Sequence, residues 1–253
     1  MALPELRLNV ILGELAKHDR VLVKEMADRL NVSRETIRRD LKELELSGQL
    51  RCTYGGAIRA QSEGDQPVSR RMRVNAREKA TIARYAARLV RDDTTIFVDA
   101  GTTTLAFARH LVNRDRVRVF TNSLDIAQIL AGGSVAEVCV VGGRVRPDYR
   151  AMLGPLTLEA VERHVFDAAF VSVAAVDYVH GFMDYGQDEA SLRRVLARHA
   201  REVVMMADSA KFGRTASVRT LELRQVHRLV TDAAPAAPFA TKLTDAGIEI
   251  IHA

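Results

Sequence analysis

The first 45 residues carry apolar side chains every three to four positions, a spacing that predicts α-helices. Three helices are expected, over residues 6–15, 23–30 and 33–44. The hydroxyl of Ser33 can accept a hydrogen bond from a free backbone N–H of the first turn, so the third helix is expected to begin there. Asn31 and Val32 supply a tight turn before it, and this arrangement is typical of a helix-turn-helix.

The third helix has a charged face opposite its apolar one. At about 100° per residue, Ile37, Leu41 and Leu44 share one side, while a row of polar side chains projects from the other. Guanidinium and ammonium groups bind phosphates and guanine edges, so this face is the expected DNA-reading surface. Its candidate residues are Ser33, Arg34, Glu35, Thr36, Arg38, Arg39 and Lys42.

A short β-hairpin is predicted over residues 49–58. Ser47-Gly48 breaks the helical pattern before it, and Gly55-Gly56 supplies its turn. Three helices and a hairpin wing make a winged helix-turn-helix domain over residues 1–58. Binding of duplex DNA is the favoured role, and the alternative is a small helical domain that binds protein.

A polar segment follows, and residues 59–74 are expected to be a linker. The stretch from Arg59 to Ser69 contains Gly64 and Pro67 and shows neither helical nor strand periodicity. Basic residues gather from Arg70 to Arg77. Two interpretations of this basic cluster stay open, contact with DNA phosphates and a solvated start of a helix.

Residues 75–253 alternate between strand-like and helical patterns. This rhythm predicts an α/β domain in which a mostly parallel sheet is covered by helices. Strands are expected at 95–99, 117–121, 137–141, 168–173, 203–207, 228–231 and 248–251. Helices are expected around 82–89, 105–111, 124–130, 156–164, 189–199 and 239–246.

Polar and glycine-rich loops follow several of these strands. In open sheets of this type, ligands bind beyond the carboxyl ends of the strands. Asp99-Ala100-Gly101-Thr102-Thr103-Thr104 follows the first strand, Thr121-Asn122 closes the second, and Gly142-Gly143 follows the third. Backbone N–H groups and hydroxyls at such a strand-to-helix turn can bind a phosphate, although threonines also serve there as simple caps. Lys211, after the strand at 203–207, can add a positive charge.

Composition narrows the class of protein. The chain has 253 residues, of which 47% are hydrophobic, so it can bury a full core. Its two cysteines, Cys52 and Cys139, give no disulfide framework or clustered metal site, and no apolar run approaches a membrane span. A cytoplasmic protein without cofactor, resident metal or membrane partner is expected. The formal net charge of +5 permits nucleic-acid binding, and the basic excess lies in the N-terminal third.

Two sets of motifs resemble the DeoR family of bacterial transcriptional regulators. The first runs from Arg7 through V-S-R-E-T-I-R-R-D-L, L-E-L-S-G-Q-L-R and G-G-A, and the second is the order G-T-T-T, T-N, G-G and D-S-A-K-F-G. The resemblance covers nearly the whole chain. It implies a DNA-binding domain joined to a sensor related to ribose-phosphate isomerases, whose effector is a phosphorylated sugar or related metabolite. The effector contacts that it implies are Asp99, Gly101, Thr102, Thr103, Thr104, Thr121, Asn122, Gly142, Gly143 and Lys211, with residues 102–104 holding the phosphate.

The expected function is a repressor of a sugar-catabolism operon that binds operator DNA as a homodimer or higher homo-oligomer. One segment departs from the family pattern, because small or branched residues at 171–177 replace the glycines of a ligand-facing turn. Asp177 and Asp184 are candidates for contacts with sugar hydroxyls or for simple turn caps.

The alternative function is a sugar-phosphate isomerase with an appended DNA-binding module. The acidic Asp-Gly-x-Asp-Glu run of the isomerases is not found, and the nearest place reads Ala-Val-Asp-Tyr. A nicotinamide site is weaker still, because Gly101-Thr102-Thr103-Thr104 lacks the G-x-G-x-x-G spacing. The protein is therefore expected not to be an enzyme.

Overall fold

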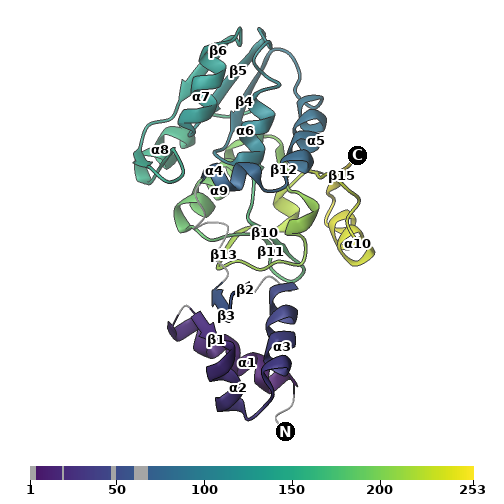
Figure 1. The fold of residues 1–253 in the computed structure, drawn as a ribbon. Coiled ribbons are helices and arrows are strands. Elements are labelled where there is room, and N and C mark those ends of the chain that lie inside the picture. Colours follow the sequence, from purple (N-terminus) through teal and green to yellow (C-terminus); the bar gives the residue numbers. More distant parts are fainter. Residues whose placement is uncertain (1–3, 19, 47–49, 60–67) are drawn as a thin grey trace. The chain divides into compact units, whose positions relative to one another are not determined.

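The structure is a computed structural model that describes residues 4–18, 20–46, 50–59 and 68–253. The chain divides into two compact units, residues 1–65 and 66–253 (Figure 1). Each unit has its own hydrophobic core.

The N-terminal unit is a winged helix-turn-helix, as the sequence predicts. Its elements are α1 (Pro4–His18), β1 (Arg20–Leu22), α2 (Val23–Leu30), α3 (Arg34–Leu46), β2 (Leu50–Thr53) and β3 (Gly56–Arg59). The wing is an antiparallel β2–β3 hairpin, and β1 pairs with β3 on its other side. Gly56 is needed at that pairing, because an added Cβ would lie 2.1 Å from the carbonyl oxygen of Val21. Side chains from all three helices, among them Ile11, Met26 and Ile37, form the core.

The C-terminal unit is built on a seven-stranded sheet. Its strands are β4 (Thr94–Val98), β5 (Val117–Thr121), β6 (Glu137–Val140), β9 (Ala168–Ser172), β12 (Val203–Met206), β14 (Arg228–Val230) and β15 (Glu249–Ile251). They lie in the order β15-β14-β12-β9-β4-β5-β6, and each neighbouring pair is parallel. The predicted α/β class and mostly parallel sheet are confirmed.

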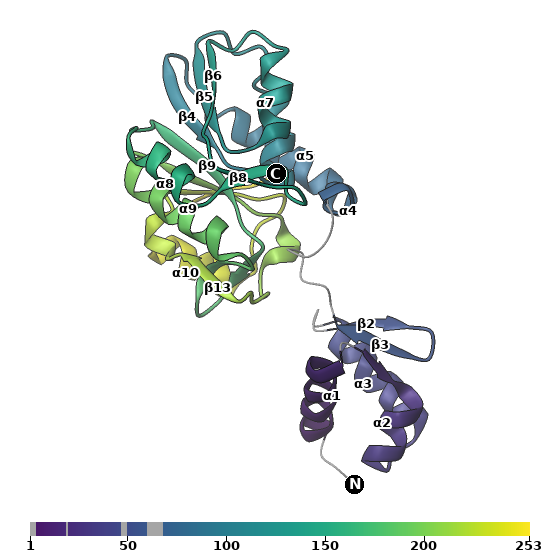
Figure 2. The same cartoon turned by 90° about the vertical axis from the view of Figure 1, so that its left-hand side faces the viewer.

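Helices cover both faces of this sheet (Figures 1 and 2). They are α5 (Ala76–Ala87), α6 (Thr102–Ala108), α7 (Leu124–Ala131), α8 (Pro155–Glu162), α9 (Gln187–His199) and α10 (Ala237–Asp245). The alternation of β4 side chains separates two cores: Ile96 and Val98 pack with α5, α6 and α7, whereas Phe97 packs with α8, α9 and α10.

Three parts of this unit were not anticipated from the sequence. The helix α4 (Val68–Arg73) lies inside the stretch expected to be a linker, so the prediction of a linker over 59–74 is wrong for those six residues. Residues 60–67 of the expected linker lie outside the described residues. The other two parts are small antiparallel sheets, one formed by β7 (Arg144–Arg146) and β8 (Ala151–Leu153), the other by β10 (Ala175–Asp177), β11 (Gly181–Asp184) and β13 (Val218–Leu221).

The strand order has a switch point beside β4. From β4 the chain moves outward to β5 and β6, and then returns to β9 on the other side of β4. At such a point, the loops beyond the carboxyl ends of adjacent strands diverge and leave a crevice. The loop from Asp99 to Gly101 and the start of α6 lie at this end of β4. Among the described residues, no helix is long and apolar enough to span a membrane.

Candidate DNA-reading face and sensor pocket

The helix α3 begins where the sequence predicts. Oγ of Ser33 accepts a hydrogen bond from the N–H of Thr36 at 3.1 Å. It also lies 2.9 Å from Oγ1 of Thr36. Asn31 adopts the left-handed conformation with φ of 51° and ends α2, which forms the turn of the helix-turn-helix. The N-terminal end of α3 is therefore fixed by a local cap.

The predicted reading face of α3 is exposed. Its apolar side chains, Ile37, Leu41 and Leu44, are buried in the core of the unit. Thr36 is half-buried, and Arg38 makes an exposed ion pair with Glu35 at 3.1 Å. The exposed members of the predicted set are Ser33, Arg34, Glu35, Arg38, Arg39 and Lys42. These side chains form one polar surface of the size and chemistry that a major groove accepts.

Two contacts, one buried and one partly buried, hold α3 in place. Arg7 of α1 donates from Nε and Nη2 to both carboxylate oxygens of Asp40, at 2.8 and 2.9 Å. Asp40 accordingly raises the pKa of Arg7 through this hydrogen bond. Glu45 accepts a hydrogen bond at 2.8 Å from the N–H of Cys52 in the wing. Tyr54 at the turn of the wing is fully exposed, and sequence reasoning did not single it out as a surface residue.

A pocket lies at the carboxyl end of β4 in the C-terminal unit. It is lined by Val68, Arg71, Gly101, Thr102, Leu105, Ser123, Asp125 and Tyr149. Side chains pack closely against Gly101, because an added Cβ would lie 2.6 Å from Oγ of Ser172 and 3.0 Å from Oγ1 of Thr104. Ser123 caps α7 by accepting from the N–H of Ile126. The pocket therefore combines backbone, hydroxyl groups, one aromatic ring and one arginine.

Of the ten predicted effector contacts, Gly101 and Thr102 line this pocket. Thr103 and Thr104 are 1% and 0% exposed, and Oγ1 of Thr104 donates to the carbonyl of Gly101. A ligand that touched Thr103 or Thr104 would need their side chains to move. Their assignment as phosphate contacts stays a prediction.

The second predicted loop is buried behind the pocket. Thr121 donates through Oγ1 to the carbonyl of Val98 at 2.7 Å. Oδ1 of Asn122 accepts from the N–H of Ala100 at 2.8 Å, and its Nδ2 donates to the carbonyl of Met152. These bonds join the end of β5 to the loop after β4, so in this structure both side chains position the pocket loop.

The glycine pair after β6 also has a role in packing. Gly143 has φ of +140°, and an added Cβ would lie 2.0 Å from Oγ1 of Thr157, which donates to the carbonyl of Gly142. Lys211 is buried and donates from Nζ to the carbonyl of Val173 at 2.6 Å, with Asp208 3.8 Å away. Neither the glycine pair nor Lys211 belongs to the residues that line the pocket.

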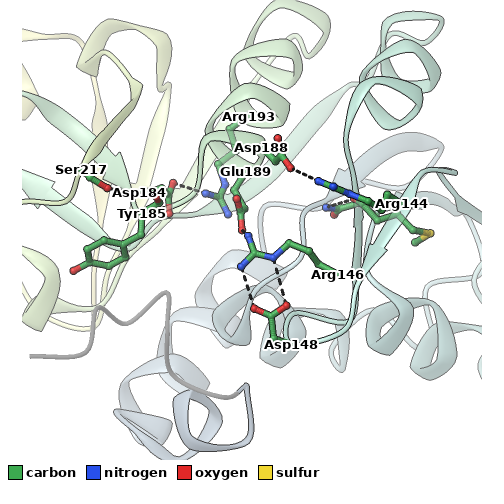
Figure 3. A network of polar contacts seen from close by, with 11 residues as sticks. Arg144, Arg146, Asp148, Asp184, Tyr185, Asp188, Glu189, Arg193 and Ser217 are labelled. Carbon is green, nitrogen blue, oxygen red and sulfur yellow. Dashed lines mark hydrogen bonds and ion pairs between the residues drawn. The ribbon is translucent and has the colours of Figure 1, made fainter. Parts of the chain in front are cut away.

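Asp99 takes part in a buried ionic network. Its Oδ2 accepts from Nε of Arg193 at 2.6 Å. Arg193 also donates to Asp184 (Figure 3). Asp184 further accepts from Oγ1 of Thr220 and from the N–H of Ala174. Burial alone would lower the pKa of Arg193, but the two carboxylates outweigh it and raise that pKa, so the guanidinium stays charged. The network joins the end of β4 to α9 and β11.

Asp177, the other aspartate considered for sugar contacts, caps the turn between β10 and β11. Its Oδ1 accepts from the N–H groups of Val179 and His180, and its Oδ2 accepts from Oγ1 of Thr215. The hydrogen bond from Thr215 lowers the pKa of this carboxyl.

Two pocket residues of clear chemical interest, Arg71 and Tyr149, were missed. Arg71 was read only as part of the basic cluster, and Tyr149 lies in the turn between β7 and β8, which the sequence pattern did not reveal. The helix α4 carries Arg71 into the pocket, whereas Arg70, Arg73 and Arg77 are exposed. For those three, both interpretations of the basic cluster, contact with DNA phosphates and a solvated start of a helix, stay open.

Comparison with known proteins supports the division of the chain into a DNA-binding unit and a sensor unit. Residues 7–63 match the DeoR-like helix-turn-helix domain, and residues 74–233 match the DeoR C terminal sensor domain. The HTH-type transcriptional repressor CsqR of Escherichia coli (strain K12) is 34% identical over 99% of this chain and 98% of its own. The Glycerol-3-phosphate regulon repressor of the same strain is 29% identical over 96% of this chain and 97% of its own.

Among solved structures, ribose 5-phosphate isomerase A from Methanocaldococcus jannaschii matches 55% of each chain with a TM-score of 0.41 and 19% identity. That level of similarity carries no conclusion about activity. The two domain matches and the full-length relatives leave one assignment: the chain belongs to the DeoR family of transcriptional regulators.

Proposed function

We propose that this protein represses a sugar-catabolism operon and releases or changes its hold on operator DNA when a phosphorylated sugar binds the sensor pocket. The observation that carries the proposal is the joining, in one chain, of an exposed basic recognition helix and a separate pocket lined by Gly101 and Thr102. A relative named for the glycerol-3-phosphate regulon supports a phosphorylated small molecule as effector.

Operator recognition is assigned to α3. Arg38, Arg39 and Lys42 supply donors for phosphates and guanine edges, and Glu35 can accept from a cytosine amino group. Ser33, Arg34 and Thr36 lie at the start of the helix, the part that enters the groove first in helix-turn-helix proteins. One such helix reads only a few base pairs, so a homodimer or higher homo-oligomer on a repeated or palindromic site is part of the proposal. These partners meet in the cytoplasm.

We further propose that the sensor is a binding domain without catalytic activity. An aldose-ketose isomerisation needs a carboxylate base beside the substrate carbon. Asp177 caps a turn through Oδ1 and accepts from Thr215 through Oδ2, and the carboxylates of Asp99 and Asp184 are committed to Arg193. No specific feature favours the isomerase alternative.

The test begins with selection of duplexes from a random DNA pool by the full-length protein. Fluorescence anisotropy on the selected duplex then measures DNA affinity with and without a panel of phosphorylated sugars, sn-glycerol 3-phosphate and their unphosphorylated counterparts. A change in DNA affinity with at least one phosphate monoester, and not with its parent sugar, is expected. A protein that selects no sequence, or that responds only to unphosphorylated compounds, contradicts the proposal.

A further inference from the structure

The helix α4 is anchored to the sensor at the edge of the pocket. The buried Nζ of Lys79 in α5 donates to the carbonyls of Arg71 and Val74, at 2.5 and 2.8 Å. Nδ2 of Asn75, between α4 and α5, donates to Oδ1 of Asp208 just beyond β12 at 2.9 Å. The backbone of Arg71 is therefore held by side chains of the sensor itself.

Two arginines lie over the ring of Tyr149. Cζ of Arg71 is 4.0 Å from the ring centroid, and Cζ of Arg146 is 4.7 Å from it. The N–H groups of Arg146 donate to carboxylates, namely to both oxygens of Asp148 and, at 2.7 Å, to Glu189 (Figure 3). The two arginines thus share a ring but differ in their remaining partners.

Arg71 has a donor that the described part of the chain leaves unused. Its Nε is buried and makes no hydrogen bond there. Burial of an N–H without an acceptor is unfavourable by about 1–3 kcal/mol, so an acceptor brought by a ligand would recover that free energy. A guanidinium stacked on an aromatic ring presents its N–H groups at its edge, in a plane that suits two oxygens of one phosphate.

The charge of the pocket favours an anion at the same place. Its lining contains one acidic side chain, Asp125, whose Oδ1 accepts from Nε of Arg150 at 2.6 Å. Gly101, Thr102 and Ser123 contribute no charge. Among the residues that line the pocket, Arg71 is therefore the basic one, and its charge is not matched by a paired carboxylate of the lining.

We propose that Arg71 binds the phosphate group of the effector, with Tyr149 holding the guanidinium flat and Thr102 and Ser123 beside the same anion. This assignment rests on the proposed control by a phosphorylated sugar and names its contact. The residue lies on α4, the first described element that follows the DNA-binding unit along the chain. Effector binding thereby acts on α4, the part of the sensor that comes first along the chain after the DNA-binding unit.

The experiment compares Arg71→Gln with Arg73→Gln in the full-length protein. Both changes remove one positive charge from α4, but Arg73 is exposed and does not line the pocket. Thermal denaturation is followed in a concentration series of inorganic phosphate and of sn-glycerol 3-phosphate, with ionic strength held constant by chloride because salt screens surface charges. Arg71→Lys, which keeps the charge without the planar group, is measured beside them.

The wild type and Arg73→Gln are expected to be stabilised equally. Arg71→Gln should raise the apparent Kd for phosphate roughly 10- to 100-fold, as expected for loss of a charge-assisted hydrogen bond. The Kd of Arg71→Lys should lie between those of the wild type and Arg71→Gln. If Arg71→Gln does not fold, a higher Kd for phosphate in Arg71→Lys than in the wild type supports the inference. Equal Kd values in these two proteins overturn it.

An equal response of Arg71→Gln and Arg73→Gln, with a responsive wild type, overturns the role of Arg71 and leaves the proposed function standing. Absence of any stabilisation of the wild type by either phosphate compound overturns the phosphate contact together with the proposed control by a phosphorylated sugar.

Discussion

Arg7 and Asp40 form a two-pronged ion pair that ties α1 to α3, with Nε–Oδ2 and Nη2–Oδ1 distances of 2.8 and 2.9 Å. Asp40 lies on the buried side of α3, one position after Arg39 on the exposed side. The pair therefore fixes the orientation of α3 relative to α1, and with it the direction of the reading face. Neither residue belongs to that face.

Asp40→Ala should consequently weaken DNA binding without removing any group that touches DNA. The change removes the carboxylate that accepts from Nε and Nη2 of the buried Arg7, so the domain should also unfold at a lower temperature. Asp28→Ala, which removes an exposed carboxylate from α2, is the control. Calorimetry and fluorescence anisotropy measure both effects, and an Asp40→Ala variant with unchanged melting temperature and DNA affinity would show that the pair does not orient α3.

Arg38→Ala and Arg39→Ala test the reading face directly. Loss of a contact to a base edge should reduce operator affinity by about 1–3 kcal/mol and relax specificity at one base pair, while loss of a phosphate contact should weaken all duplexes alike. Arg38 pairs with Glu35 in the free protein, but the pair is exposed and is expected to exchange readily for DNA. Arg109→Ala, an exposed change in the sensor, serves as the control. Unchanged footprints in both α3 variants would remove these residues from the interface.

The helix-turn-helix and the parallel sheet were predictable because both rest on local periodicity. In the N-terminal unit, Ser33 supplies its own cap signal and Ile37, Leu41 and Leu44 mark the buried side. In the sheet, runs such as residues 96–98 are apolar whichever strand lies beside them. Such features need no knowledge of distant residues.

The pocket was predictable only in part, because its remaining residues meet through long-range packing. Gly101 and Thr102 follow a strand and were found. Arg71 reaches them from α4, whose three arginines in six residues hide any apolar stripe, and Tyr149 arrives in a turn between two three-residue strands. The polar side chains of Asp99, Thr121 and Asn122 looked available in the sequence, yet their hydrogen bonds within the fold use them. Sequence spacing does not distinguish a polar group that faces a pocket from one that builds its wall.

Thr102→Val separates these two roles. Valine keeps the shape of threonine and removes the hydroxyl that lines the pocket, so affinity for a phosphate monoester should fall roughly tenfold if that hydroxyl donates to an anion. Thr103→Val, at a buried position, should have a smaller effect on affinity. Isothermal titration with sn-glycerol 3-phosphate measures both. Equal losses in the two variants, or a loss in Thr103→Val alone, would favour a rearranged loop in which residue 103 holds the phosphate.

Arg193→Met tests the buried network behind the pocket. The side chain is 4% exposed and bonds to Asp99 and Asp184, so its removal leaves two buried carboxylates without their cation. Loss of one member of such a network should lower the free energy of unfolding by about 3–5 kcal/mol at neutral pH. Arg198→Met, an exposed change on the same helix, should have little effect. Urea denaturation at pH 7 provides the comparison.

The pH dependence of the Arg193→Met variant should identify the carboxylates as the source of its instability. Burial raises the pKa of Asp99, and loss of Arg193 removes the largest interaction that opposes this rise. A carboxyl whose pKa is higher in the folded than in the unfolded state destabilises the fold when ionised, and this penalty shrinks as pH falls through the folded-state pKa. The stability gap between wild type and variant should therefore narrow from pH 7 toward about pH 4, near the ordinary carboxyl range. A gap that stays constant over that range would mean that lost packing, and not unpaired charge, accounts for the effect.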